Sequence, residues 1–136
     1  MELKPLTDGL SVTPQVRVED VPKLARLGFR SLMGNRPEGE TPDQPAWEEL
    51  AAEARRHGLE ARQIPVVPGK IGDADVSAFR QALEDMPGPI AAFCRTGTRS
   101  AMLWALANPD HLSPEDRLRT AAEQGYDLSA LRERLG

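Results

Sequence analysis

A continuous apolar run at residues 89–93 (PIAAF) places the strongest constraint on how this chain can fold. A strand without polar alternation is typical of the centre of a parallel sheet that helices cover on both faces. A helical pattern begins only a few residues later, near Thr98. We therefore expect a buried central strand that passes through a short loop directly into a helix.

The rest of the chain alternates strand patterns with helical patterns. The expected strands are Leu10–Thr13, 29–33 and 61–67, and the expected helices are 18–28, 46–57 and 73–86. From Thr98 to the end the pattern is helical, with breaks at Asn108 and near Gly125. This order predicts an α/β layered fold, with a mainly parallel central sheet flanked by helices, in a single domain over residues 1–136.

Apolar spacing identifies the buried face of each predicted helix. Val21, Leu24 and Leu27 share one face of the first helix, and Trp47 and Trp104 fall at core positions of later ones. At the start of the helix over 73–86, an aspartate is well placed as the cap. These patterns describe packing and suggest no chemistry.

Composition excludes several functional classes. The net charge is −4 and no basic run is longer than Arg55–Arg56, so we expect no nucleic-acid partner. No apolar stretch approaches the roughly 20 residues of a membrane span, and the first ten residues lack the apolar region of a secretory signal. One cysteine and two separated histidines form no metal-ligand cluster, so we expect no metal and no other cofactor. A lone thiol fits a reducing cytoplasm.

The loop at residues 94–100 (CRTGTRS) concentrates the residues that carry chemistry. If it curls around the sulfur of Cys94, successive backbone N–H groups point inward, and Gly97 permits the tight turn. The amino end of the following helix adds a positive dipole. Such a nest favours the thiolate and would also hold an oxyanion. An isolated buried cysteine is most often a small core residue, but arginines and hydroxyl residues around it favour a functional site.

Three residues of this loop have predicted catalytic roles. Cys94 is the expected nucleophile, Arg99 is placed to contact two oxygens of a ligand, and the Ser100 hydroxyl is expected to donate to the sulfur. The predicted substrate-binding residues are Arg95, Thr96, Gly97, Thr98, Asn35, Arg36 and Lys70. For Asn35 and Arg36 a solvated turn is an equally good interpretation, and a lone exposed lysine usually serves solubility.

The spacing Cys-x-x-Gly-x-Arg-Ser resembles the signature loop of cysteine-dependent protein phosphatases and of rhodanese sulfurtransferases. Together with four other segments it resembles the bacterial beta-lactamase-hydrolase-like family, whose domain is similar to a dual-specificity phosphatase. Those segments are residues 10–15 (LSVTPQ), 35–39 (NRPEG), 65–69 (PVVPG) and 73–75 (DAD). The resemblance implies a phosphatase-like fold and, in some relatives, partnership with a persulfide dioxygenase of metallo-β-lactamase type in sulfide detoxification.

The length of the loop between cysteine and arginine distinguishes phosphatases from rhodanese sulfurtransferases, the two enzyme groups that the loop resembles. Cysteine phosphatases place five residues between cysteine and arginine, whereas Cys94 and Arg99 are separated by four, as in rhodaneses. A phosphatase also needs a general acid; residues 66–70 hold no carboxylate, and the helix start predicts that Asp73 and Asp75 are caps. A redox sensor would require a second, resolving cysteine, but Cys94 is the only cysteine in the chain.

We therefore expect a sulfurtransferase that moves sulfane sulfur from a small anionic donor to a thiol acceptor through a Cys94 persulfide. The expected donor is thiosulfate or a low-molecular-weight persulfide. The alternative is a cysteine-dependent phosphatase of the dual-specificity type that acts through a phosphocysteine.

Overall fold

The computed structural model describes residues 1–136 and is built on a five-stranded sheet of order β1-β2-β5-β3-β4. The strands are β1 (Lys4–Thr7), β2 (Leu10–Thr13), β3 (Ser31–Gly34), β4 (Glu60–Gln63) and β5 (Ile90–Phe93). β1 pairs antiparallel with β2, and all other pairs are parallel. Strand β5 lies at the centre with all four residues buried, which confirms the α/β fold with a mainly parallel sheet.

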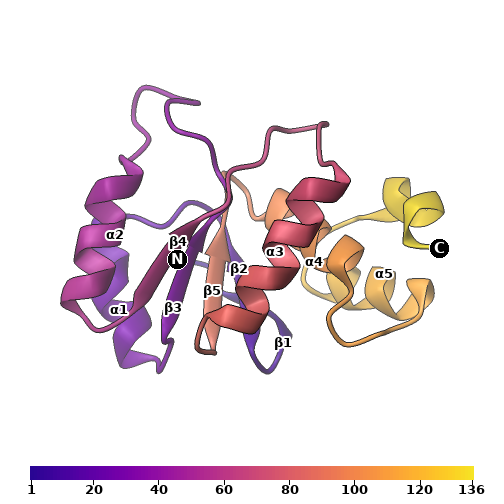
Figure 1. Ribbon diagram of the computed structural model, residues 1–136, viewed down its shortest axis with the longest axis horizontal. Helices are drawn as coiled ribbons and strands as arrows, with labels where there is room; N and C mark the ends of the chain where they lie inside the picture. Colours follow the sequence, from indigo (N-terminus) through magenta and orange to yellow (C-terminus); the bar gives the residue numbers. More distant parts are fainter.

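Helices cover both faces of this sheet (Figure 1). α1 (Val21–Arg26) and α2 (Trp47–Arg56) lie on one face, and α3 (Asp73–Asp85) and α4 (Thr98–Ala107) lie on the other. α5 (Pro114–Glu123) and a 3₁₀ segment (Ser129–Leu135) pack beyond α4. None of the helices combines the length and hydrophobicity that crossing a bilayer requires.

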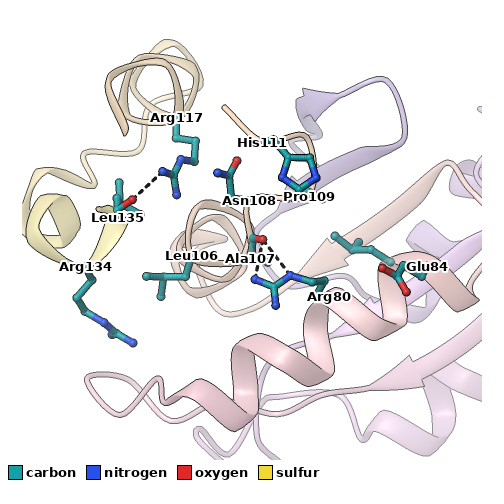
Figure 2. Close-up of a pocket in the computed structure, with 11 residues that line it drawn as sticks. Arg80, Glu84, Leu106, Ala107, Asn108, Pro109, His111, Arg117, Arg134 and Leu135 are labelled. Carbon is teal, nitrogen blue, oxygen red and sulfur yellow. Dashed lines mark hydrogen bonds between the residues drawn. The ribbon is translucent and has the colours of Figure 1, made fainter. Parts of the chain in front are cut away.

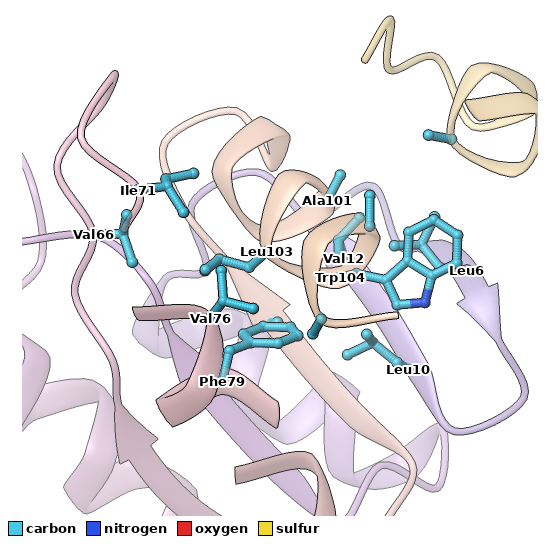
Figure 3. Packing of buried hydrophobic residues seen from close by; sticks show 14 of the residues in the cluster. Leu6, Leu10, Val12, Val66, Ile71, Val76, Phe79, Ala101, Leu103 and Trp104 are labelled. Carbon is cyan, nitrogen blue, oxygen red and sulfur yellow. The ribbon is translucent and has the colours of Figure 1, made fainter. Parts of the chain in front are cut away.

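Two hydrophobic cores follow from the alternation of side chains along β5. Ala92 belongs to the core beneath α3 and α4, whereas Ala91 and Phe93 belong to the core beneath α1 and α2. Figure 3 shows the first core, where Phe79 of α3 and Trp104 of α4 lie over the sheet. Successive residues of a strand point to opposite faces, so one apolar run serves both cores.

The first predicted helix is shorter than expected. A 3₁₀ turn (Val18–Asp20) precedes α1, and the helix ends at Arg26, so the expected burial of Leu27 is wrong: the residue is 63% exposed. Val21 and Leu24 are buried as predicted. Leu27 follows the last helical residue, and its backbone still has helical angles and donates to the Lys23 carbonyl, so it is the side chain alone that lies outside the core.

Strand bounds also differ from the expectation. β4 ends at Gln63 because Pro65 has no N–H to continue the ladder, and β3 covers Ser31–Gly34 rather than 29–33. β1 was not predicted. At α3 the cap is not Asp73: Gly72 precedes the helix and its N–H donates to Asp75 Oδ2 at 2.9 Å. The predicted breaks at Asn108 and Gly125 are confirmed, and both residues have positive φ.

The carboxyl ends of β2, β3 and β5 meet at one edge of the sheet. Because parallel strands end on the same side, the segments that follow them converge there. Residues 14–17, 35–46 and 94–97 are these segments. They build the candidate site.

Candidate active site

Cys94 follows β5 directly and is completely buried. Its Sγ accepts a hydrogen bond from the backbone N–H of Gly97 at 3.1 Å. Gly97 has φ of +93° and caps the amino end of α4, which begins at Thr98. The loop therefore turns back so that a backbone donor points at the sulfur, which is the start of the nest expected from the sequence.

Arg99 lies in the first turn of α4 and forms a two-point ion pair with Glu40. Its Nη1 and Nη2 donate to Glu40 Oε2 and Oε1 at 2.8 and 2.9 Å, and Nη1 also donates to the Val66 carbonyl at 2.9 Å. Burial acts to lower the pKa of Arg99, but the bond to Glu40 and the nearby Cys94 raise it overall. The guanidinium is thus fixed and charged beside the cysteine.

Glu40 is shared between two arginines. Its Oε1 also accepts from Arg36 Nε at 2.9 Å. The hydrogen bond from Arg99 holds the pKa of Glu40 below its ordinary value, against the opposing effect of burial and with further help from Arg36. Sequence reasoning missed this residue; the available signal was that a buried arginine is rarely left without an acidic partner.

Arg36 is almost completely buried and bonds to three other side chains. Its side chain is 4% exposed, and its Nη1 and Nη2 donate to Gln15 Oε1 at 2.9 Å and Thr41 Oγ1 at 3.2 Å. The guanidinium therefore braces the segment 36–41 that carries Glu40. Substrate binding by Arg36 stays a prediction, and three of its five N–H donors are used within the protein.

Asn35 and Ser100 bond to each other, and the Ser100 hydroxyl does not bond to the sulfur of Cys94. The Ser100 hydroxyl donates to Asn35 Oδ1 at 2.8 Å, and Asn35 Nδ2 donates to the Ile64 carbonyl at 3.0 Å. Both side chains are fully buried. The expected bond from Ser100 to the sulfur of Cys94 is therefore corrected: the pair ties β3 to α4 beneath the loop.

The remaining predicted residues lie on the surface of the loop or near it. Arg95 and Thr96 are exposed and Thr98 is half-buried, with Thr96 Oγ1 donating to Thr98 Oγ1 at 2.9 Å. Lys70 is exposed on the segment that follows Val66. Their roles in binding remain predictions from the sequence.

Tyr126 supports the loop from the segment after α5. Its hydroxyl donates to the Thr96 carbonyl at 3.2 Å. A Cβ at Gly97 would lie 2.1 Å from Tyr126 Oη and 3.3 Å from the carbonyl carbon of Thr13, so the loop passes too close to these groups for any side chain there. Burial, with a smaller effect of Cys94, raises the pKa of Tyr126 to about 12, so its phenol is a neutral donor.

A cavity of about 480 Å³ lies elsewhere, between α3, α4 and the C-terminal segment (Figure 2). Its arginines bond to backbone: Arg80 donates to the Ala107 carbonyl, and Arg117 donates to those of Ala105 and Leu135. The carbonyls of Ala105 and Ala107 lie at the carboxyl end of α4, and that of Leu135 lies in the 3₁₀ segment. No residue of the loop 94–100 lines this cavity, so it is not the pocket of the cysteine.

Residues 2–110, including the whole cysteine loop, match the family described as beta-lactamase hydrolase-like protein, phosphatase-like domain. The chain belongs to this family. The beta-lactamase hydrolase-like protein of Xylella fastidiosa strain Temecula1 is 36% identical over 130 residues, which cover 94% of this chain and 30% of that protein. This chain therefore spans about 30% of the length of the curated relatives. Tyr126 lies outside residues 2–110, the range that matches the family model.

Solved structures give the same assignment of the fold. A protein of Neisseria meningitidis Z2491, described as a candidate phosphatase, has a TM-score of 0.89 and 31% identity, covering 99% of this chain and 96% of that one. Tk-PTP, solved in its active form, has a TM-score of 0.73 and 12% identity over 98% of this chain and 92% of its own, which shows the fold alone. The beta-lactamase-hydrolase-like resemblance and the cysteine-phosphatase-like fold are both confirmed.

Proposed function

We propose that this phosphatase-like domain is a cysteine-dependent phosphatase in which Cys94 attacks a phosphate monoester. The observation that carries the proposal is the pairing of a buried cysteine, hydrogen-bonded by the loop, with an oriented Arg99 at the carboxyl edge of a cysteine-phosphatase fold. The candidate phosphatase of Neisseria, 31% identical over nearly the whole chain, supports it. This reverses the order of preference drawn from the sequence, because the comparisons lend no support to sulfur transfer.

The chemistry has two balanced steps. The Cys94 thiolate attacks phosphorus, the S–P bond forms, and the P–O bond to the leaving group breaks with its electron pair on the departing oxygen. Water then attacks the phosphocysteine, the S–P bond breaks, and inorganic phosphate leaves as the thiolate is regenerated. Backbone N–H groups of the loop and the Arg99 guanidinium stabilise charge on the phosphoryl oxygens in both steps.

Protonation of the leaving oxygen needs an acid, and neither Glu40 nor the aspartates of α3 are suited to supply it. Glu40 is bound to two arginines and its lowered pKa keeps it a carboxylate, so it is a poor proton donor. Asp75 caps α3, and Asp73 is exposed at the first residue of that helix. Substrates whose leaving group is weakly basic, such as aryl phosphates, therefore suit the site best.

The test is steady-state hydrolysis of p-nitrophenyl phosphate by the wild type, Cys94→Ser and Arg99→Ala. We expect phosphate release by the wild type, none by Cys94→Ser, and a rate lowered by about 10²–10³ in Arg99→Ala. Arg56→Ala, on the exposed end of α2, is the matched control and should retain the wild-type rate. Activity that survives in Cys94→Ser would overturn the proposal.

One observation favours sulfur transfer as a second candidate. The four residues between Cys94 and Arg99 make a smaller ring than the five of cysteine phosphatases, which suits a single terminal sulfur. In that case the partners would be a small anionic donor, a thiol acceptor and a persulfide dioxygenase. Sulfite release from thiosulfate, measured on the same preparations, separates the two candidates.

A further inference from the structure

A cavity of about 200 Å³ adjoins the cysteine loop, and none of its lining residues is hydrophobic. We call it the arginine pocket. Its lining includes Gln15, Arg17, Arg36, Thr41, Asp43 and Arg95.

The arginine pocket lies on the same edge of the sheet as the nucleophile. Gln15, Arg36 and Arg95 each follow the carboxyl end of a parallel strand, β2, β3 and β5 respectively, and Arg95 is the residue next to Cys94. Gln15 joins the other two, because its N–H donates to the Arg95 carbonyl at 3.3 Å and its Oε1 accepts from Arg36 at 2.9 Å. The arginine pocket therefore lies beside the loop that carries Cys94.

The charges in the arginine pocket favour an anion. Three arginines and one carboxylate line it. Arg36 is occupied by Glu40, but Arg95 is exposed and has no acidic partner in the structure, and Arg17 approaches Asp43 only at 3.9 Å. Both members of that last pair are exposed, 47% and 79%, and exposed pairs of this kind contribute little. Arg17 and Arg95 are thus free to bind oxyanions of a ligand.

We propose that the arginine pocket binds a second anionic group of the substrate, a phosphate or a carboxylate, while the phosphoryl group to be cleaved lies on Cys94. This rests on the proposed function and narrows its substrate class to small polyanionic phosphate monoesters. The lining is predominantly polar, with Pro45 as its one nonpolar residue, so specificity in such a site comes from its few polar side chains.

Calorimetric titration of the Cys94→Ser protein, which cannot turn over a substrate, tests this directly. The probes are inorganic phosphate, phosphonoacetate and methylenebisphosphonate at one ionic strength. We expect at least one two-anion probe to bind about tenfold more tightly than phosphate, which corresponds to about 1.4 kcal/mol. Tighter binding of phosphonoacetate indicates a carboxylate as the second group, and tighter binding of methylenebisphosphonate indicates a phosphate.

The readout is the ratio of dissociation constants, since damage to the nest weakens all three probes together. Adding Arg17→Gln and Arg95→Gln should bring the ratio close to one, while Arg56→Gln, which removes one positive charge elsewhere, should preserve it. The inference would be overturned if Cys94→Ser bound all three probes with equal affinity or bound none of them measurably. It would also be overturned if the ratio stayed the same after both pocket substitutions. If the ratio of dissociation constants depends on Arg17 and Arg95 but the wild type shows no phosphatase activity, the pocket assignment holds and only the proposed reaction is wrong.

Discussion

Arg99 and Glu40 meet through two hydrogen bonds of 2.8 and 2.9 Å beside the cysteine loop, although 59 positions separate them in the chain. A planar pair of this kind fixes both the position and the rotation of the guanidinium. Arg36 Nε donates to Glu40 Oε1, the same oxygen that accepts from Arg99 Nη2. The segment after β3 thus determines where the arginine of the loop after β5 is held.

Replacing Glu40 by Gln should lower the free energy of unfolding at pH 7 by about 1.5–3 kcal/mol, because charge-assisted bonds to two arginines are lost. The pKa of Glu40 is lowered in the folded state, so its contribution is complete above the ordinary value of 4.5. Below that value the unfolded chain takes up the proton first, and the advantage of the wild type declines. Urea denaturation of both proteins as a function of pH measures this.

Glu133→Gln is the matched control for that experiment, because Glu133 is exposed in the C-terminal segment. It should unfold like the wild type at every pH. If the difference in free energy of unfolding between wild type and Glu40→Gln stayed the same through the acid range, the stabilisation by Glu40 would not come from its ion pair.

Ser100→Ala should destabilise the fold by about 1–3 kcal/mol, since the buried amide oxygen of Asn35 loses its donor. The rate at which iodoacetamide alkylates Cys94 should not fall, because the hydroxyl does not bond to the sulfur; a rise would reflect more frequent opening around the buried thiol. Denaturation and alkylation can be followed on the same samples. Normal stability combined with a much slower alkylation would instead support a bond from the Ser100 hydroxyl to the sulfur of Cys94.

Tyr126→Phe should cost about 0.5–1.5 kcal/mol by removing the bond to the Thr96 carbonyl. The pKa of Tyr126 is raised to about 12, so its contribution is present below the ordinary value of 10 and is lost as pH rises toward 12. Alkaline denaturation should therefore reveal a slope in the wild type that the variant lacks. Identical alkaline profiles would contradict the placement of this hydroxyl, and no other tyrosine in the chain can confuse the measurement.

Gly97→Ala should be more damaging than strain alone explains. Its φ of +93° costs about 1–2 kcal/mol for any residue with a Cβ, and the new methyl group would also collide with Tyr126 Oη. Gly28→Ala is a matched control, with φ of +94° and no atom within 4 Å of the added Cβ. Thermal unfolding of both variants separates strain from collision; equal losses would mean that the loop can move away from Tyr126.

Local pattern in the sequence was sufficient to predict the central features of this fold. The apolar run of β5, the glycine at position 97 and the helix that follows lie in one continuous stretch, residues 90–107, so their arrangement can be predicted without knowledge of the rest. β1 escaped prediction because its pattern is short and polar, although Asp8-Gly9 is a recognised hairpin turn that joins it to β2.

The partners of the site residues could not be predicted in the same way. Glu40 and Tyr126 reach the loop from segments that carry no local sign of the contact, and Ser100 is close enough to the sulfur in sequence to suggest a bond that Asn35 takes instead. Such choices depend on how separate elements pack, and a hydroxyl has only one proton to donate.

The central claim is that Cys94 carries a phosphoryl group during turnover. Rapid acid quench of the wild type during hydrolysis of p-nitrophenyl phosphate, followed by intact-protein mass spectrometry, tests it most directly, with Cys94→Ser and a parallel incubation with thiosulfate as comparisons. We predict a mass gain of one phosphoryl group that requires Cys94, and no stable sulfur adduct. A Cys94-dependent gain of one sulfur atom from thiosulfate, with no phosphoryl adduct and no phosphate released, would contradict it and assign the protein to sulfur transfer.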